Sequence, residues 1–141
     1  MLKQIFIFIT GLAMFIIATS ALEFLVPLAL GIDGIPADIM QEQEALKSFM
    51  ERQPAAYYLG LILVHAIASV IGGMVIGLGG LPKWAIYLLA GCFMALGYLL
   101  VRIGSPTWFL VLDLSVYIPG ALLGYEWVNR TRKLVAEKAK G

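Results

Sequence analysis

Residues 105–120, SPTWFLVLDLSVYIPG, form a long apolar segment that contains a single carboxylate, Asp113. A helix that spans a bilayer needs about 20 predominantly apolar residues, and this segment stays mostly apolar as far as residue 128. An ionisable side chain inside such a segment costs about 2.5–3.5 kcal/mol on insertion scales and is almost always paired. The segment therefore predicts a transmembrane helix in which Asp113 faces a partner inside the protein.

The composition of the whole chain is typical of a membrane protein. Of its 141 residues, 61% are hydrophobic and 13% are charged, and the mean hydropathy is +0.91. Soluble domains are roughly 45–50% apolar and about 25% charged. The formal net charge of +1 argues against binding to nucleic acid, which requires a basic patch. The lone Cys92 supplies neither a disulfide nor a metal-binding pair.

Four apolar segments are long enough to span a bilayer, and glycine- and proline-containing turns separate them. The segments are about 4–30, 55–79, 84–103 and 107–128. Helices are expected because backbone polar groups must be satisfied internally in lipid. We predict an all-α polytopic membrane protein, an antiparallel bundle of four transmembrane helices in a single domain, 1–141. A cleaved signal peptide is the alternative for the first segment, although its apolar part is longer than signal peptides have.

The connection between the first two spans is amphipathic. Residues 36–53 mix apolar and charged side chains, with Pro36 suited to a first helical turn and Pro54 to the end of the helix. We predict a short amphipathic helix on the outer surface, resting on the bundle or on lipid headgroups. A structural connector is the expected role, and a lid or docking element is the alternative.

Lysine and arginine residues near the span ends predict the orientation. With four spans, seven cations lie on one side: Lys3, Lys83, Arg130, Arg132, Lys133, Lys138 and Lys140. The other side has three, diluted by carboxylates: Lys47, Arg52 and Arg102. We therefore expect a multi-pass protein of the bacterial cytoplasmic (inner) membrane with both termini cytoplasmic. The basic tail, 129–141, should lie near anionic headgroups.

Small residues recur at helical spacing on the last three spans, and in lipid such residues allow helices to pack closely. The predicted helix-packing positions are Ala66, Ser69, Gly73, Gly77, Gly91, Ala95, Gly120 and Gly124. Packing of this kind occurs within one chain or between copies. A groove or pore lined by these residues is the alternative.

Polar side chains share those faces and lie in the outer half of the predicted bundle. Counted at about 1.5 Å per residue, Glu23 and Asp113 lie roughly 6–10 Å deep and His65 about 15 Å deep. The short turn before the last span makes Arg102 the expected partner of Asp113, whereas Glu23 either shares Arg102 or pairs with His65. The predicted intramembrane network is Glu23, His65, Tyr98, Arg102, Asp113 and Tyr117.

Three roles fit this network. The first is a structural set of salt bridges and hydrogen bonds that holds the helices together, and the second is a proton or cation pathway through Glu23, His65 and Asp113. The third is a metal site built from the same three residues, which lack any ligand-spacing motif. We find no catalytic motif, and we expect no catalytic residue, no metal and no cofactor.

The last span also resembles that of a group of small uncharacterised bacterial membrane proteins. These proteins combine a (His/Ser)-Pro-x-Trp-Phe entry with a later proline and a small-residue-Gly end. The matching residues are Ser105-Pro106-Thr107-Trp108-Phe109, Pro119 and Gly124, and looser similarity extends to Glu23, Pro27, Pro54 and Gly72-Gly73. The resemblance implies a four-span architecture and no known activity.

We expect a non-catalytic accessory or structural subunit, not an enzyme, that packs with itself as a homo-oligomer or with a larger membrane complex. The alternative is a small channel or transporter for protons or cations that uses Glu23, His65 and Asp113. A cavity that reaches His65 would favour transport, whereas a dry, fully paired network would favour the subunit.

Overall fold

The computed structural model describes residues 1–36, 38–39, 42–101 and 103–139. This part of the chain is helical apart from its turns and loops, so the all-α prediction is confirmed for it. Its helices are α1 (Leu2–Glu23), α2 (Leu25–Leu30), α3 (Gln43–Glu51), α4 (Ala55–Gly79), α5 (Trp84–Val101) and α6 (Thr107–Lys138). The helical segments Leu2–Leu30, Ala55–Gly79 and Thr107–Lys138 are long and apolar enough to cross a membrane, and Trp84–Leu99 is a shorter apolar helix.

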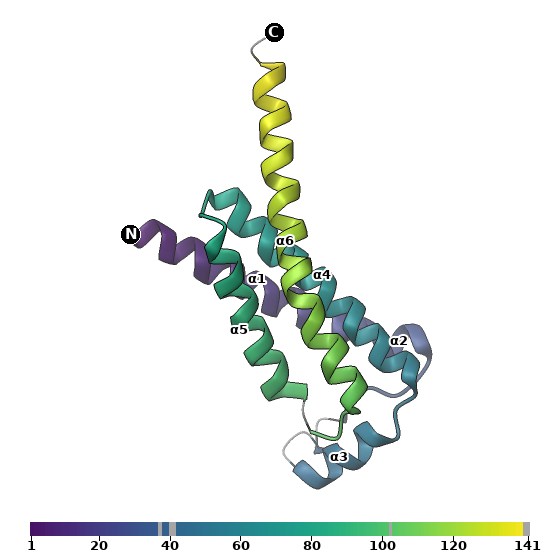
Figure 1. Ribbon diagram of the computed structural model, residues 1–141. Helices are drawn as coiled ribbons and strands as arrows, with labels where there is room; N and C mark the ends of the chain where they lie inside the picture. The colour runs from purple at the N-terminus through teal and green to yellow at the C-terminus, as the bar shows by residue number, and fades with distance from the viewer. Residues whose placement is uncertain (37, 40–41, 102, 140–141) are drawn as a thin grey trace.

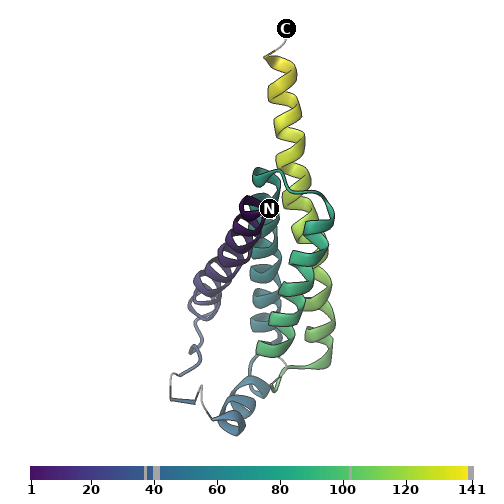
Figure 2. The same cartoon turned by 90° about the vertical axis from the view of Figure 1, so that its left-hand side faces the viewer.

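Helix α4 lies at the centre of the fold (Figure 1). It packs most extensively against α6 and then against α1, while α5 packs mainly against α6. The N-terminus and the turn between α4 and α5 lie toward the end from which α6 projects, and α3 lies at the opposite end. From the N-terminus toward the α3 end, α1 diverges from α5 and α6 (Figure 2).

Glycines allow α4 and α6 to come close together. A Cβ atom at Gly73 would collide with the carbonyl oxygen of Ala121, and one at Gly124 would collide with the carbonyl oxygen of Val70. Ser69 lies at the same contact, because a Cβ atom added at Gly120 would lie 2.9 Å from the Cβ of Ser69. Close backbone approach through small residues is the packing mode that lipid favours. Ala66 and Gly77 of α4 also border α6.

On α5 the structure differs from the prediction. Gly91 and Ala95 are exposed, and a Cβ atom at Gly91 would meet nothing within 4 Å. The buried face of α5 instead contains Ile86, Leu89, Ala90, Phe93 and Gly97. A four-residue spacing of small residues identifies a helical stripe but not its direction, and here bulky side chains occupy the inward stripe.

The first apolar segment is interrupted near its end. Helix α1 ends at Glu23 and α2 begins at Leu25, where the sequence predicted one continuous span. Pro27 explains the interruption, since it has no N–H to donate to the carbonyl of Glu23. Gly31 then ends α2 in the left-handed conformation (φ 62°), which glycine adopts without steric cost.

Helix α3 is shorter than the predicted amphipathic helix and starts at Gln43 rather than near Pro36. Asp38 and Ile39 form a turn, with the Ile39 N–H donating to the Pro36 carbonyl at 3.3 Å. Residues 37, 40 and 41 of the predicted range lie outside the described residues.

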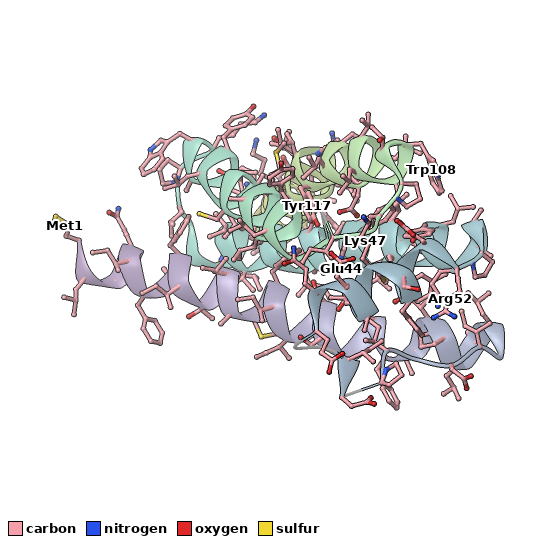
Figure 3. The ribbon with its side chains drawn as sticks, turned by 90° about the horizontal axis from the view of Figure 1, so that it is seen from below. Met1, Glu44, Lys47, Arg52, Trp108 and Tyr117 are labelled. Atoms are coloured by element: carbon pink, nitrogen blue, oxygen red, sulfur yellow. The ribbon has the colours of Figure 1, made fainter. Side chains whose placement is uncertain are left out.

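Helix α3 lies across one end of the bundle, as the view from below shows with Glu44 and Lys47 in front (Figure 3). Its side chain Met50 is buried, and the Tyr58 hydroxyl of α4 donates to the Met50 carbonyl at 2.5 Å. Gly104 (φ 72°) lies against the backbone of Lys47 so closely that a Cβ atom would meet its carbonyl oxygen at 2.8 Å. These contacts fix α3 to the bundle.

Helix α6 continues ten residues beyond the predicted span end at residue 128. Its Arg132 donates to the carbonyls of Gly77, at 2.8 Å, and Leu78. Both carbonyls belong to the last turn of α4, which lacks the i+4 donors of a continuing helix, and that of Gly77 also accepts from the Gly80 N–H at 3.0 Å. The Tyr125 hydroxyl donates to the Leu81 carbonyl at 3.1 Å. Side chains of α6 therefore cap the end of α4.

The close contact at Gly73 predicts that an added methyl group destabilises the protein there but not at the exposed Gly91. Gly73→Ala should lower the free energy of unfolding by about 1–3 kcal/mol, the usual cost of overpacking, because its Cβ meets a backbone oxygen that cannot move alone. Gly91→Ala adds the same methyl group on an exposed face and should be neutral or stabilising by up to about 1 kcal/mol. Thermal unfolding of both variants in the same detergent, followed by circular dichroism, compares them. Equal losses would contradict the packing described.

Candidate functional site

A single imidazole joins three helices in the interior. His65 of α4 is 3% exposed, and its Nδ1 atom lies 2.5 Å from Oδ1 of Asp113 on α6. Its Nε2 atom lies 2.9 Å from Oε1 of Glu23, the last residue of α1. Both distances are within hydrogen-bond range. His65 therefore bridges the two carboxylates.

Asp113 receives a second hydrogen bond from its own helix. Tyr117, four residues later on α6, donates its hydroxyl proton to Oδ2 of Asp113 at 3.0 Å and lies 3.2 Å from Nδ1 of His65. The His65 and Tyr117 rings are stacked with their centroids 5.7 Å apart. Ser69 donates to the His65 carbonyl at 2.7 Å, within α4. The i, i+4 spacing of both pairs places their members on one helix face.

The hydrogen bonds allow the protons of the cluster to be counted. Each of the two N···O contacts of His65 requires one proton, so the imidazole and the two carboxyl groups share two protons. Either His65 is an imidazolium between two carboxylates, or it is neutral and one carboxyl group is protonated. Both arrangements give these three groups a charge of −1. Proton transfer along the contacts therefore rearranges the cluster without changing its charge.

The two carboxyl groups lie in different environments. Asp113 is 1% exposed. Phe109 precedes it by one turn on α6, Ala121 follows Tyr117 by one turn, and both are fully buried. The Glu23 side chain is 41% exposed. Phe15 of α1 stacks on Phe93 of α5, with ring centroids 3.7 Å apart, and packs edge-on against Tyr117. One end of the cluster is closed by packed side chains, and the other end is open.

The open end faces a cavity of about 830 Å³. Glu23, His65 and Tyr117 line it, together with residues from α1 to α5 and from the loop after α2. Its walls are mainly apolar and aromatic, with Phe15, Phe24, Ile32, Leu61 and Leu96 among them. The cavity was not predicted from the sequence, because it depends on the divergence of α1 and on the position of the loop at 32–35.

The structure places the predicted site residues as follows. Glu23, His65, Asp113 and Tyr117 lie together, while Tyr98 is 47% exposed on α5, away from the inward stripe predicted for it. Arg102, the expected partner of Asp113, lies outside the described residues. Within the described chain, the groups that contact the Asp113 carboxylate by hydrogen bonds are His65 and Tyr117. The pairing of Glu23 with His65 was one of the two alternatives from the sequence.

A second ion pair lies at the end of the bundle opposite α3. The Lys83 ammonium is 3.0 Å from Oε1 of Glu126, and both side chains are exposed. The hydrogen bond to Glu126, together with its negative charge, raises the pKa of Lys83. Lys83 therefore remains charged, as expected of a residue in the polar region beyond the apolar helices.

Metal binding does not follow from the geometry of the cluster. Both ring nitrogens of His65 face carboxylate oxygens at hydrogen-bond distance, so neither lone pair is directed at a vacant position. Among the side chains that the structure describes, no group of three His, Cys, Asp or Glu residues has the arrangement of a metal site.

Comparison of the chain with known proteins finds no matching family model, no matching curated protein and no matching solved structure. The resemblance to small four-span bacterial proteins therefore stays a prediction.

The buried carboxylate predicts an ordered pair of stability losses. Asp113→Ala removes the partner of both His65 and Tyr117 and should destabilise the protein by about 3–5 kcal/mol, as when one member of a buried pair is removed. Asp113→Asn retains a group that forms hydrogen bonds and should cost less. Unfolding of both variants by denaturant in detergent micelles gives the two values. Indistinguishable losses would show that hydrogen bonding at this position does not contribute to stability.

Proposed function

We propose that this protein is a small membrane transporter that moves protons or cations by way of Glu23, His65 and Asp113. The observation that carries the proposal is the asymmetry of the cluster. The Glu23–His65 end reaches an 830 Å³ cavity, whereas Asp113 lies in packed protein. A cluster with a role only in stability has no need of an open end beside a half-exposed carboxylate.

The contacts support a defined proton transfer. The two-proton cluster is the loaded state, and in the unloaded state, with one proton fewer, His65 is neutral and carries its proton on Nδ1. A proton that arrives from the cavity then binds to Oε1 of Glu23 and passes to Nε2 of His65, which breaks the O–H bond and forms an N–H bond. The Nδ1–H bond of His65 then breaks, and its proton binds to Oδ1 of Asp113. The imidazole accepts at one nitrogen and donates from the other, as histidine does in proton shuttles. The Tyr117 hydroxyl stabilises the Asp113 carboxylate while it is charged.

Release of the proton on the other side requires the packed end to open. Two helices contain residues near this end that favour bending, which supports such a motion. Pro119, two residues after Tyr117, has no N–H for the Ser115 carbonyl within α6. Gly72 and Gly73 lie one turn beyond Ser69 in α4, and paired glycines are common sites of helix bending. Opening at these positions would expose Asp113 to the second side and give alternating access.

The proposed setting is a bilayer that four helical segments cross, in the bacterial inner membrane with both termini cytoplasmic. Helix α5 is the fourth span in this arrangement. Its 18 residues extend about 27 Å at 1.5 Å per residue, close to the hydrocarbon thickness of about 30 Å. The short turn between α4 and α5 contains Lys83. It would then lie on the cytoplasmic side, as positively charged loops do.

An accessory subunit is the second candidate, and the length of α6 favours it. Its 32 residues extend about 48 Å at 1.5 Å per residue, longer than the bilayer core. Leu134 and Val135 near its end are 59% and 63% exposed. Apolar side chains on a projecting helix are suited to contact with another membrane protein or a second copy. Loss of a co-purifying protein in the variant Leu134→Glu/Val135→Glu, with retention in Lys138→Gln, is expected if this face is the contact.

Proton flux into liposomes tests the transport proposal. The wild-type protein, reconstituted with a pH-sensitive dye inside the vesicles, should dissipate an imposed pH gradient faster than empty vesicles do. Glu23→Gln and Asp113→Asn should each reduce the flux by at least about tenfold, because each removes a group that must bind the proton. Glu126→Gln is the matched control, since it makes the same change at an exposed carboxylate outside the cluster.

Flux in Glu23→Gln and Asp113→Asn equal to that of Glu126→Gln would reject the transport proposal. Circular dichroism of each variant establishes that it remains folded. A variant that keeps its helical spectrum but loses flux has lost a proton-binding group and not its structure.

A further inference from the structure

The cavity beside Glu23 has the properties of a ligand site. Its volume of about 830 Å³ falls within the range of about 300–1,000 Å³ found for small-molecule pockets. Such pockets have mainly apolar walls and a few polar groups that orient the ligand. The ionisable side chains that line it are Glu23, Asp33 and His65, and the described residues of its wall include no lysine or arginine. The cluster of Glu23, His65 and Asp113 carries a net charge of −1, so the charge at the cavity is negative.

We propose that this cavity binds a lipophilic organic cation, with the Glu23 carboxylate as its counter-ion. The inference rests on the proposed transport function and assigns a substrate class to the same site. Oε1 of Glu23 is held by His65 at 2.9 Å, so the carboxylate is fixed in position while the side chain remains 41% exposed. A ligand cation can therefore approach a carboxylate that is already oriented.

Charge and wall chemistry decide between the possible ligands. An organic anion would be repelled by Glu23 and Asp33. A small inorganic cation needs several oxygen ligands in place of its water. Besides the two carboxylates, the described side chains of the wall offer the hydroxyl oxygens of Thr19, Ser20, Tyr57 and Tyr117, and the rest of the wall is mainly aromatic and aliphatic. An organic cation gains from burial of its apolar groups against Ile32, Leu61 and Leu96.

Aromatic side chains provide a further interaction for a cation. Phe15, Phe24, Tyr57 and Tyr117 all line the cavity. A cation near the face of an aromatic ring is attracted by about 0.5–2 kcal/mol, with the larger values in desolvated sites. Aromatic walls beside a carboxylate are therefore suited to a quaternary or phosphonium-type cation, which cannot use ordinary hydrogen bonds.

The interruption between α1 and α2 lies at the wall of the cavity. Phe24 is 73% exposed and lines the cavity together with Pro27 and Leu28. These residues lie beside the point at which the backbone hydrogen bonding is broken by Pro27. We expect a lipophilic molecule dissolved in the bilayer to reach Glu23 from the side of Phe24 and Leu28, which are exposed.

Equilibrium binding of two ions of matched shape tests the proposal. The purified full chain in mild detergent is titrated with tetraphenylphosphonium and, separately, with tetraphenylborate, and protein-free micelles correct for partitioning. We expect saturable binding of tetraphenylphosphonium and no saturable binding of tetraphenylborate. Glu23→Gln should weaken phosphonium binding at least about tenfold, since one partner of a partly buried ion pair is removed. Glu126→Gln should leave it unchanged.

A second variant keeps the test decisive if Glu23→Gln does not fold. Leu96→Trp retains the carboxylate and fills part of the cavity, so it should also abolish phosphonium binding. Tetraphenylborate binding as tight as that of tetraphenylphosphonium would overturn the proposal. So would unchanged phosphonium binding in both Glu23→Gln and Leu96→Trp.

The binding experiment and the flux experiment can fail separately. Phosphonium binding that depends on Glu23, in a protein without proton flux, would support the ligand class and reject the transport step. Proton flux that depends on Glu23, in a protein that does not bind tetraphenylphosphonium, would support the proton relay and overturn the lipophilic-cation site.

Discussion

The pair of hydrogen bonds from one imidazole to two carboxylates is the interaction on which the rest of the structure depends. Charged groups in an apolar environment are stable only when they are paired and hydrogen-bonded. His65 meets this requirement for Asp113 on one ring nitrogen and for Glu23 on the other. Because the three residues come from α4, α6 and α1, pairing their charges also fixes the positions of these helices. The cluster thus connects three helices through one imidazole.

Packing and chemistry are coupled through α4. One face of this helix carries Gly73, which brings the backbone of α6 close, and that approach places Asp113 within reach of His65. Another face of α4 meets α1 along its length, from Ile7 beside Gly79 to Glu23 at His65, while α1 diverges from α5 and α6 toward the α3 end (Figure 2). The close contact accounts for the closed, buried Asp113 end, and the divergence accounts for the cavity at the Glu23 end. The close approach of α6 to α4 and the divergence of α1 from α5 and α6 together produce the difference in access that the proposed transport requires.

The sequence predicted the elements better than their contacts. The start and end of α4 and the starts of α5 and α6 agree with predicted spans because hydropathy and turn residues act locally. Rotation of a helix about its axis is not local. Gly91 and Ala95 fit a packing stripe by spacing but lie on the exposed face. Proximity along the chain favoured Arg102 as the partner of Asp113, whereas the structure places His65, 48 residues away, at 2.5 Å. The cavity depends on helix divergence and loop position, which no periodicity encodes.

The chain contains one histidine, so nitrogen-15 NMR of histidine-labelled protein reports on the cluster alone. A His65 that bridges Asp113 and Glu23 should show two hydrogen-bonded ring nitrogens with distinct partners. Glu23→Gln should then shift mainly the Nε2 resonance, and Asp113→Asn mainly the Nδ1 resonance. Glu126→Gln should shift neither. A spectrum typical of a free imidazole, unchanged by both cluster variants, would contradict the claim that His65 bridges the two carboxylates.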